Sequence, residues 1–242
     1  MFPKLSGTGR PPRNIATFVN MENWRKKYYH YFQNRSFLAS FFWSCGFLAV
    51  SLVVNFYAAV YAAERASNPV TDIILNNIRV YDVDVFFIYG PILLLIFLTY
   101  LLLVEPQKLP FVLKSISLFV LIRSGFITLT HIGPFPTHLV LDPTSFITHF
   151  TSANDLFFSG HTGLPFLLAL MFWDNKNLRF VFLGFSILFG VVVLLGHIHY
   201  SIDVLSAFFI TYSIFQICKF LFEKEWQMFF EPEAHPPLAE KN

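Results

Sequence analysis

The stretch Gly196-His-Ile-His-Tyr-Ser-Ile-Asp-Val-Leu-Ser-Ala-Phe-Phe209 places two histidines and a carboxylate inside one of the most apolar parts of the chain. The letters VVVLL stand directly before it, and its last two residues open the run FFITY. Polar groups at membrane depth are costly in free energy and usually mark a functional site. The stretch therefore predicts two membrane-spanning helices that meet at a polar turn, with functional side chains at that turn.

The composition of the whole chain predicts lipid as its main solvent. Of the 242 residues, 55% are hydrophobic and 13% are charged, which is about half the charged share of an ordinary soluble domain. Six apolar runs can be read as helices that cross about 30 Å of hydrocarbon. We therefore expect an all-α, polytopic membrane protein built as a six-transmembrane-helix bundle. The six expected spans are 37–63, 85–104, 111–132, 159–173, 180–199 and 202–222.

The segments outside these spans give the expected organisation and topology. Residues 1–36 form a basic and aromatic segment, in which Trp24-Arg-Lys-Lys-Tyr-Tyr-His-Tyr-Phe32 has a composition that suits the membrane interface. A disordered basic tail is the alternative for residues 1–20. Residues 37–222 form the predicted catalytic domain, and residues 223–242 are expected to be a disordered tail. Fourteen of the 17 Lys and Arg residues fall on the side that carries both termini. Because cytoplasmic loops carry the Lys and Arg excess, we expect both termini in the cytoplasm. The formal net charge of +2 is then a result of the membrane topology and does not indicate nucleic-acid binding.

Most of the histidines fall at the opposite, exoplasmic side of this predicted bundle. Three exoplasmic segments are expected there, at 64–84, at 133–158 and at the short turn 199–202, and the histidines concern the last two. Six of the eight histidines lie on or beside them: His131, His138, His149, His161, His197 and His199. This clustering predicts a site at the exoplasmic face.

His199 and Asp203 are four residues apart, so they lie on one helical face if the last span begins before His199. A carboxylate at that distance holds one imidazole nitrogen and leaves the other unprotonated and directed outward. An imidazole oriented in this way is a nucleophile or a base. The alternative is that Asp203 only caps the last helix while His199 satisfies it at the interface.

A second histidine motif, Phe158-Ser-Gly-His-Thr162, opens the fourth span. Ser159 and Thr162 are residue types that cap helices, Gly160 lets a ligand approach the backbone, and His161 lies in the first turn. The amides at a helix N-terminus bind anions such as phosphate. The alternative for this motif alone is an ordinary capped helix start.

Together these motifs resemble the paired signatures of the type 2 phosphatidic acid phosphatase (PAP2) superfamily, through Ser159-Gly-His161 and His199-x-x-x-Asp203. The chain more closely resembles the sphingomyelin synthase branch of that superfamily. Asp155-Leu-Phe-Phe-Ser-Gly-His-Thr162 is similar to the third motif of that branch, and His197-Ile-His-Tyr-Ser-Ile-Asp-Val204 to the fourth. Its two other motifs have weaker counterparts: Arg123-Ser-Gly-Phe-Ile-Thr128 is similar to the second, and Pro69-Val-Thr-Asp72 is a faint echo of the first.

The resemblance implies a bundle with a PAP2-like core and a phosphohistidine mechanism. By it, His199 is the nucleophile, Asp203 orients His199, and His161 is the acid and base for the lipid hydroxyls that leave and arrive. No cofactor and no metal are implied.

The resemblance also implies residues that hold the substrate. Arg123 and the amides of Ser159 and Gly160 are expected to bind phosphate oxygens. Asp155 is expected to hold either His161 or a cationic head group. For His197 we expect packing or hydrogen bonding and assign no catalytic role.

The departures from both patterns bear on the substrate. The phosphatase branch has an arginine six residues before its nucleophile, where this chain has Val193. One arginine suits the single charge of a phosphodiester better than the nearly two charges of a phosphomonoester. We therefore expect transfer of a phosphocholine or phosphoethanolamine type head group from a membrane phospholipid to a lipid alcohol such as ceramide or diacylglycerol. Gly133-Pro134, Ala153-Asn154 and Ile198 depart from the synthase pattern and leave head group and acceptor open.

Several alternatives remain open from sequence. They are a phosphatidate-type lipid phosphatase, a catalytically silent lipid-binding or transport relative, and a zinc site built from His161, His197 and His199. Closely spaced histidine pairs for a di-iron hydroxylase do not occur, and Ser159 lacks the preceding glycine of a serine-protease turn. Arg123 has the alternative role of a structural anchor for a nearby carboxylate. A homo-oligomer is left open.

Overall fold

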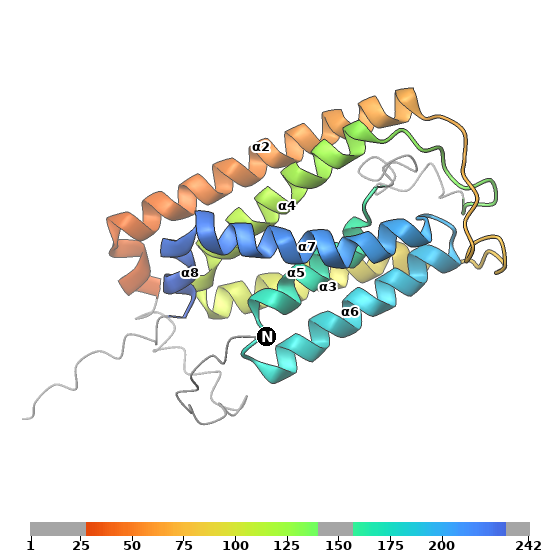
Figure 1. The fold of residues 1–242 in the computed structure, drawn as a ribbon. Coiled ribbons are helices and arrows are strands. Elements are labelled where there is room, and N and C mark those ends of the chain that lie inside the picture. Colours follow the sequence, from red (N-terminus) through yellow and green to blue (C-terminus); the bar gives the residue numbers. More distant parts are fainter. Residues whose placement is uncertain (1–27, 140–156, 231–242) are drawn as a thin grey trace, which may run out of the picture.

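The structure, a computed structural model, describes residues 28–139 and 157–230, and every regular element within these ranges is a helix. The prediction of an all-α membrane bundle is confirmed. Residues 28–33 are helical and precede the elements labelled in Figure 1. These elements are α2 (Arg35–Arg65), α3 (Asp84–Val104), the short 3-10 helix η2 (Pro106–Lys108), α4 (Leu109–Leu129), α5 (Gly160–Met171), α6 (Lys176–Leu195), α7 (Ser201–Leu221) and α8 (Glu223–Phe229).

Five helical stretches in the described ranges are long and apolar enough to cross a membrane, which corrects the prediction of six. They are α2, α3, η2 with α4, α6 and α7. The fourth expected span, 159–173, is the 12-residue helix α5, which extends only about 18 Å at 1.5 Å per residue. Its apolar run is broken by the turn around Asp174, after which the Asn175 side chain caps α6 by accepting the Leu178 N–H.

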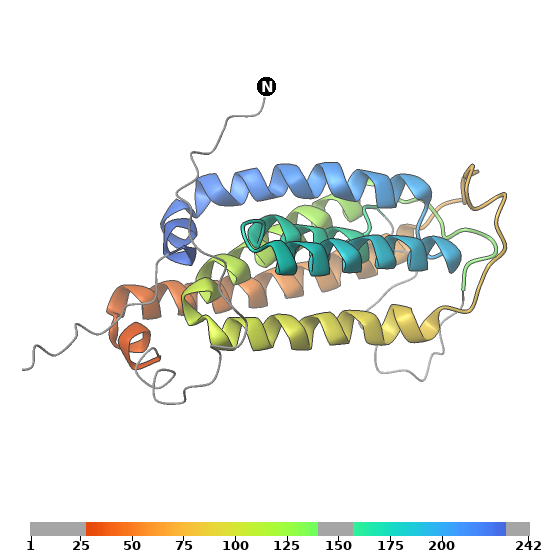
Figure 2. The same cartoon turned by 90° about the horizontal axis from the view of Figure 1, so that it is seen from below.

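Helix α5 is apolar because most of it is buried in the protein core. Its residues Leu167, Leu168 and Ala169 are fully buried, and it lies alongside α6 and α7 in both views of the bundle (Figures 1 and 2). At Gly163 a Cβ atom would come within 2.8 Å of the Thr211 hydroxyl oxygen. The absence of a side chain there lets α5 approach α7 closely.

The spanning helices expose apolar side chains, as expected of surfaces that face lipid. Examples are Trp43 on α2, Leu93 on α3 and Phe209 on α7. On α2 the apolar residues begin just after Asn34, whose side chain accepts the N–H groups of Ser36 and Phe37 and so caps the helix. The phenylalanine-rich spans thus serve both packing and contact with lipid.

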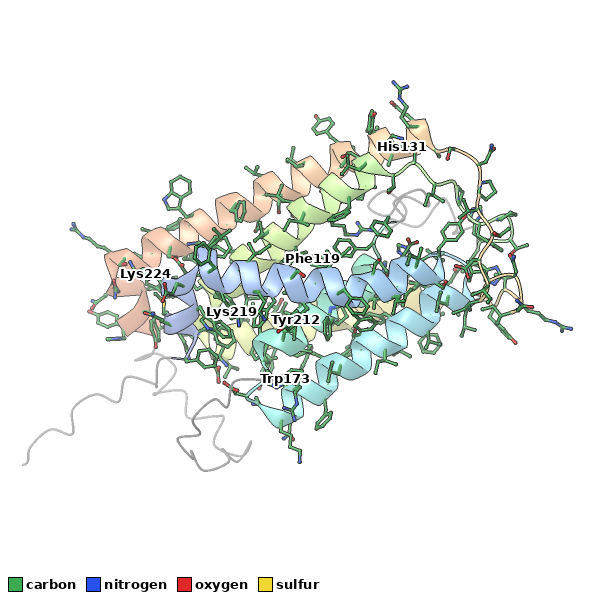
Figure 3. All side chains as sticks on the ribbon, in the orientation of Figure 1. Phe119, His131, Trp173, Tyr212, Lys219 and Lys224 are labelled. Atoms are coloured by element: carbon green, nitrogen blue, oxygen red, sulfur yellow. The ribbon has the colours of Figure 1, made fainter. Side chains whose placement is uncertain are left out.

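The two ends of the bundle differ in character. The segments 66–83, 130–139 and 196–200 connect helices at one end, where His131 lies, whereas Lys219 and Lys224 lie toward the other end (Figure 3). This separation fits the one expected from the Lys and Arg distribution. That the Lys-rich end faces the cytoplasm stays a prediction.

The expected disordered tail, 223–242, begins instead with a helix. Helix α8 packs back onto the bundle, because Trp226 contacts Phe111 at a ring-centroid distance of 4.7 Å. A buried polar cluster adds to this contact, since Glu225 accepts hydrogen bonds of 2.6 Å from both Lys114 and Ser40. The sequence analysis missed these partners because they come from distant parts of the chain.

Candidate active site

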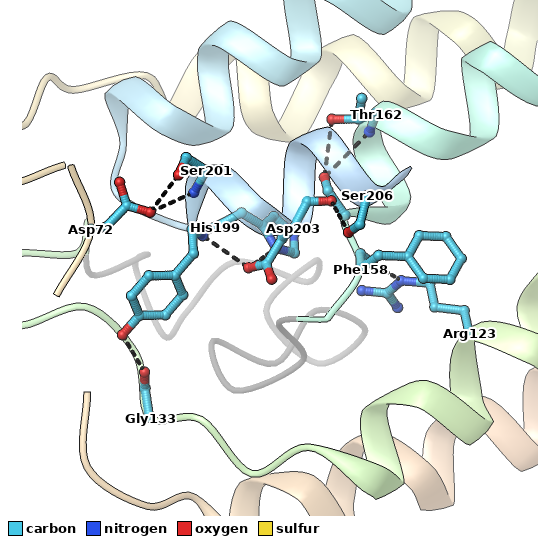
Figure 4. Close-up of polar contacts among 11 residues, drawn as sticks. Asp72, Arg123, Gly133, Phe158, Thr162, His199, Ser201, Asp203 and Ser206 are labelled. Carbon is cyan, nitrogen blue, oxygen red and sulfur yellow. Dashed lines mark hydrogen bonds and ion pairs between the residues drawn. The ribbon is translucent and has the colours of Figure 1, made fainter. Parts of the chain in front are cut away.

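His199 and Asp203 meet at the turn between α6 and α7, but they do not share a helix. Helix α6 ends at Leu195, so the expected span 180–199 is too long, and α7 begins only at Ser201. His197 lies in this turn with a φ of 52°, the left-handed region that few non-glycine residues adopt. The turn brings Nδ1 of His199 to 3.4 Å from Oδ2 of Asp203 (Figure 4).

Asp203 makes contacts that fit both of the alternatives given by the sequence. Its Oδ2 accepts the Tyr200 N–H at 2.9 Å, which caps α7, and the same oxygen faces the His199 imidazole. Asp203 is 0% exposed, and within residues 28–139 and 157–230 its Oδ1 has no hydrogen-bond partner. The His199 Nδ1 also lacks a hydrogen bond within the described part of the chain. Catalytic contacts are often long before substrate binds, so the pair has the arrangement of an imidazole with its orienting carboxylate.

The start of α5 lies directly beside this pair. The Ser159 N–H donates to the Asp203 carbonyl oxygen at 3.2 Å. The Ser159 hydroxyl in turn accepts the Thr162 N–H, so Ser159 is the N-cap of α5 as predicted. The two histidine motifs, which are far apart in sequence, therefore lie side by side.

His161 occupies the first turn of α5 between aromatic rings. Its imidazole stacks on the Phe87 ring of α3, with centroids 4.3 Å apart and planes 26° apart. The edge of Phe189 contacts it from α6 at 6.4 Å. Both His199 and Arg123 lie within electrostatic range of His161. The ring of the second histidine is thus packed between Phe87 and Phe189, within electrostatic range of the first.

Arg123 reaches the same point from α4. Its Nε–H donates to the Phe158 carbonyl oxygen at 2.8 Å, and a Cβ atom added to Gly160 would come within 3.1 Å of that nitrogen (Figure 4). Arg123 lies six residues before the end of α4 at Leu129, about 9 Å along the helix. Helix α5 begins at the same depth, so Arg123 lies at the site.

The structure supports the expectation for some of the remaining predicted residues and not for others. Two amides were expected to bind phosphate, those of Ser159 and Gly160. The Ser159 N–H donates to the Asp203 carbonyl oxygen instead. Asp155 lies outside the described residues. His197 packs and hydrogen-bonds as expected, with its Nδ1 2.7 Å from the Thr137 hydroxyl and its ring edge-on to Phe135. Among the described residues, no group of three or more His, Cys, Asp or Glu side chains could hold a metal ion.

Sequence reasoning missed the residues that hold the turn between α6 and α7. Tyr200 is buried, and its hydroxyl donates to the Gly133 carbonyl oxygen at 2.8 Å and accepts the Val70 N–H at 3.2 Å. Asp72 accepts hydrogen bonds from Ser201 at the start of α7. Asp72 belongs to the weak motif Pro69-Val-Thr-Asp72, but the sequence did not indicate that its partner is Ser201. Tyr200 gave no signal beyond its place next to His199.

Comparison with known protein families gives a match to part of the chain. Residues 152–220 match the family model described as PAP2 superfamily C-terminal. No curated protein and no solved structure matches the chain. The match supports a lipid phosphatase or phosphotransferase type of activity in general. Because the matched segment holds His161, His199 and Asp203, it supports membership of the chain in the PAP2 superfamily.

Proposed function

We propose that this protein is a membrane lipid phosphotransferase of the sphingomyelin synthase type. It moves a phosphorylated head group, of the phosphocholine or phosphoethanolamine type, from a glycerophospholipid to ceramide or diacylglycerol. The observation that carries the proposal is the contact between the His199–Asp203 pair and the N-terminus of α5, which bears His161. The site lies on the exoplasmic face and both termini lie in the cytoplasm.

The reaction proceeds in two displacements at phosphorus. Nε2 of His199 attacks the phosphorus of the donor, and the bond from phosphorus to the glycerol oxygen breaks. His161 gives a proton to that oxygen, so diacylglycerol leaves and the head group stays on His199. The hydroxyl of the acceptor lipid then gives its proton to His161 and attacks the same phosphorus. The bond from phosphorus to His199 breaks, and both histidines return to their starting states.

Asp203 supports the first step through the charge on His199. When Nε2 bonds to phosphorus, the imidazole becomes cationic, and the Asp203 carboxylate 3.4 Å from Nδ1 stabilises that charge. The buried position of Asp203 strengthens the interaction, since water screens it little. This step therefore depends on an ionised Asp203.

Arg123 and the Gly160 amide are the groups that bind the phosphate oxygens. Gly160 is the first residue of α5, and the N–H at that position has no acceptor within its own helix. Val193, where the phosphatase branch has a second arginine, is fully buried, and its carbonyl oxygen accepts the Ile198 N–H at 2.9 Å. This favours a singly charged phosphodiester over phosphatidate.

Replacing Gly160 with alanine is expected to lower kcat/KM by about tenfold, because a shift of about 1 Å at a reacting group is costly. The new methyl group would stand 3.1 Å from Arg123 Nε and push the guanidinium aside. Gly184→Ala is the matched control, since a Cβ atom there meets nothing within 4 Å. Steady-state transfer rates of both variants give the comparison. Wild-type kcat/KM in Gly160→Ala would mean that Arg123 does not hold the phosphate.

The proposed function is tested with purified protein in liposomes of phosphatidylcholine and phosphatidylethanolamine. Fluorescent ceramide and fluorescent diacylglycerol are offered as acceptors, and radiolabelled phosphatidate is offered separately. We expect labelled phospholipid or sphingolipid products and no release of inorganic phosphate. Release of phosphate from phosphatidate without any head-group transfer would identify a phosphatase instead. Absence of both reactions would identify a silent relative.

A further inference from the structure

Asp72 lies in the loop 66–83, 129 residues before Ser201, and its carboxylate joins the two segments. Oδ2 accepts the Ser201 N–H at 2.7 Å and the Ser201 hydroxyl at 2.8 Å. Oδ1 accepts the N–H groups of Ile74 and Leu75 at 2.8 and 3.0 Å. Each oxygen thus has two donors, and the side chain is 7% exposed. A carboxylate held by four hydrogen bonds has a fixed position and serves as an anchor.

The anchor acts at a defined point of α7. Ser201 is the first residue of that helix, and its N–H has no acceptor within the helix. Asp72 therefore caps α7 from another loop and places a negative charge at the positive end of the helix dipole. Asp203 caps the same helix through the Tyr200 N–H. The two carboxylates engage neighbouring amides, immediately after His199.

The Tyr200 side chain provides a second anchor beside the first. Its hydroxyl donates to the Gly133 carbonyl oxygen and accepts the Val70 N–H, which ties the turn to two loops. Val70 and Asp72 come from the same loop, so one segment engages both residues that follow His199. On the other side of His199 the backbone is set by the left-handed conformation of His197.

Asp72 stays ionised under ordinary conditions. Burial by itself raises the pKa of Asp72, but the hydrogen bonds from Leu75, Ser201 and Ile74 outweigh it and lower that pKa below its usual value. A lowered pKa means that the anchor is present at neutral pH and is lost only as the pH falls through that low value. Two titratable side chains, His197 and Tyr200, are near enough for the charge of Asp72 to act on them.

We propose that Asp72 is a positioning residue: it holds Ser201, and with it the turn that presents His199 to Asp203. The inference rests on the proposed function, because the residue that Asp72 positions, His199, is the nucleophile of that reaction. Within the described residues, Asp72 accepts four hydrogen bonds from protein groups, and three of the donors are backbone N–H groups, so it acts mainly through the backbone.

The test compares Asp72→Ala with Asp82→Ala in nanodiscs. Asp82 is an exposed aspartate of the same loop, and it accepts only the Asp84 N–H among the contacts described. Two properties are measured for each variant: hydrogen–deuterium exchange of the peptide 196–205, and kcat and KM for head-group transfer. In Asp72→Ala we expect the amide hydrogens of this peptide to exchange faster than in the wild type. We also expect kcat to fall about ten- to a hundredfold with KM nearly unchanged, because misplaced reacting groups slow the chemical step. Asp82→Ala should match the wild type in both.

The outcomes separate the anchor from the reaction. Wild-type kcat in Asp72→Ala, or unchanged exchange of the peptide 196–205, would overturn the proposal. A wild-type protein that transfers no head group would overturn the proposed function, while the exchange comparison would still decide whether Asp72 holds the turn. If Asp72→Ala does not fold, Ser201→Ala replaces it. This variant removes one hydrogen bond and keeps the N–H, so it should lose about two- to tenfold in kcat, and wild-type kcat and exchange in it would count against the anchor.

Discussion

Replacing His199 with alanine is expected to lower head-group transfer by at least about a thousandfold, because it removes the atom that bonds to phosphorus. No other described side chain has the same relation to a carboxylate at this site. The His199 side chain is buried, but its Nδ1 has no hydrogen bond within the described residues, so the substitution breaks none at that atom. The unfolding temperature should therefore change little. Transfer of a fluorescent acceptor by the purified variant, with a thermal melt of the same sample, checks both expectations.

His138→Ala is the matched control for this experiment. His138 lies at the same end of the bundle, and its Nδ1 is 2.7 Å from the Phe135 carbonyl oxygen. It is close to the site in the fold but has no place in the reaction, so its variant should keep wild-type transfer. Equal turnover in His199→Ala and wild type would remove His199 as the nucleophile.

Replacing Asp203 with asparagine is expected to lower kcat by about a hundred- to ten-thousandfold, by analogy with aspartates that orient a catalytic histidine. The amide carries no charge to stabilise a cationic His199, although its oxygen can still accept the Tyr200 N–H. The cost of burying an incompletely paired carboxylate also disappears. The unfolding temperature should therefore stay the same or rise while activity falls, as is typical of functional sites.

Kinetics and thermal melts of Asp203→Asn and Asp174→Asn check this prediction. Asp174 is exposed and lies in the turn between α5 and α6, far from the site, so its variant should behave as wild type. If Asp203→Asn kept its activity but unfolded at a much lower temperature, Asp203 would be only a helix cap.

Much of the bundle could be predicted from sequence, because a long apolar run in a chain so poor in charge typically forms a helix that spans the membrane. The expected spans 85–104 and 202–222 match α3 and α7 to within one residue at either end. Span 159–173 was misread because an apolar run cannot show whether lipid or protein surrounds it. The structure surrounds α5 with protein.

Contacts of the site could be predicted where they depend on the spacing or type of residues close together in the sequence. The four-residue interval between His199 and Asp203 predicted that the two side chains meet, although a left-handed residue at His197 and not a helical face brings them together. A positive φ at a histidine leaves no clear mark in sequence. The N-cap at Ser159 followed from residue type alone, and the structure confirms it.

Other contacts of the site link segments far apart in the chain, and local patterns do not contain them. Phe87 stacks on His161 from a span that looked uniformly apolar. Asp72 reaches Ser201 across 129 residues. Such partners depend on how the helices and loops assemble, which a single sequence does not reveal.

Rapid-quench labelling tests the central claim, that His199 takes up the head group, most directly. The purified protein is mixed with a phospholipid labelled in its phosphorylated head group, quenched at intervals within one turnover, and digested. We predict an acid-labile label on His199 that forms and decays at the rate of transfer. Transfer that is completed with no label on the protein, or with the label on a different residue, would contradict the account.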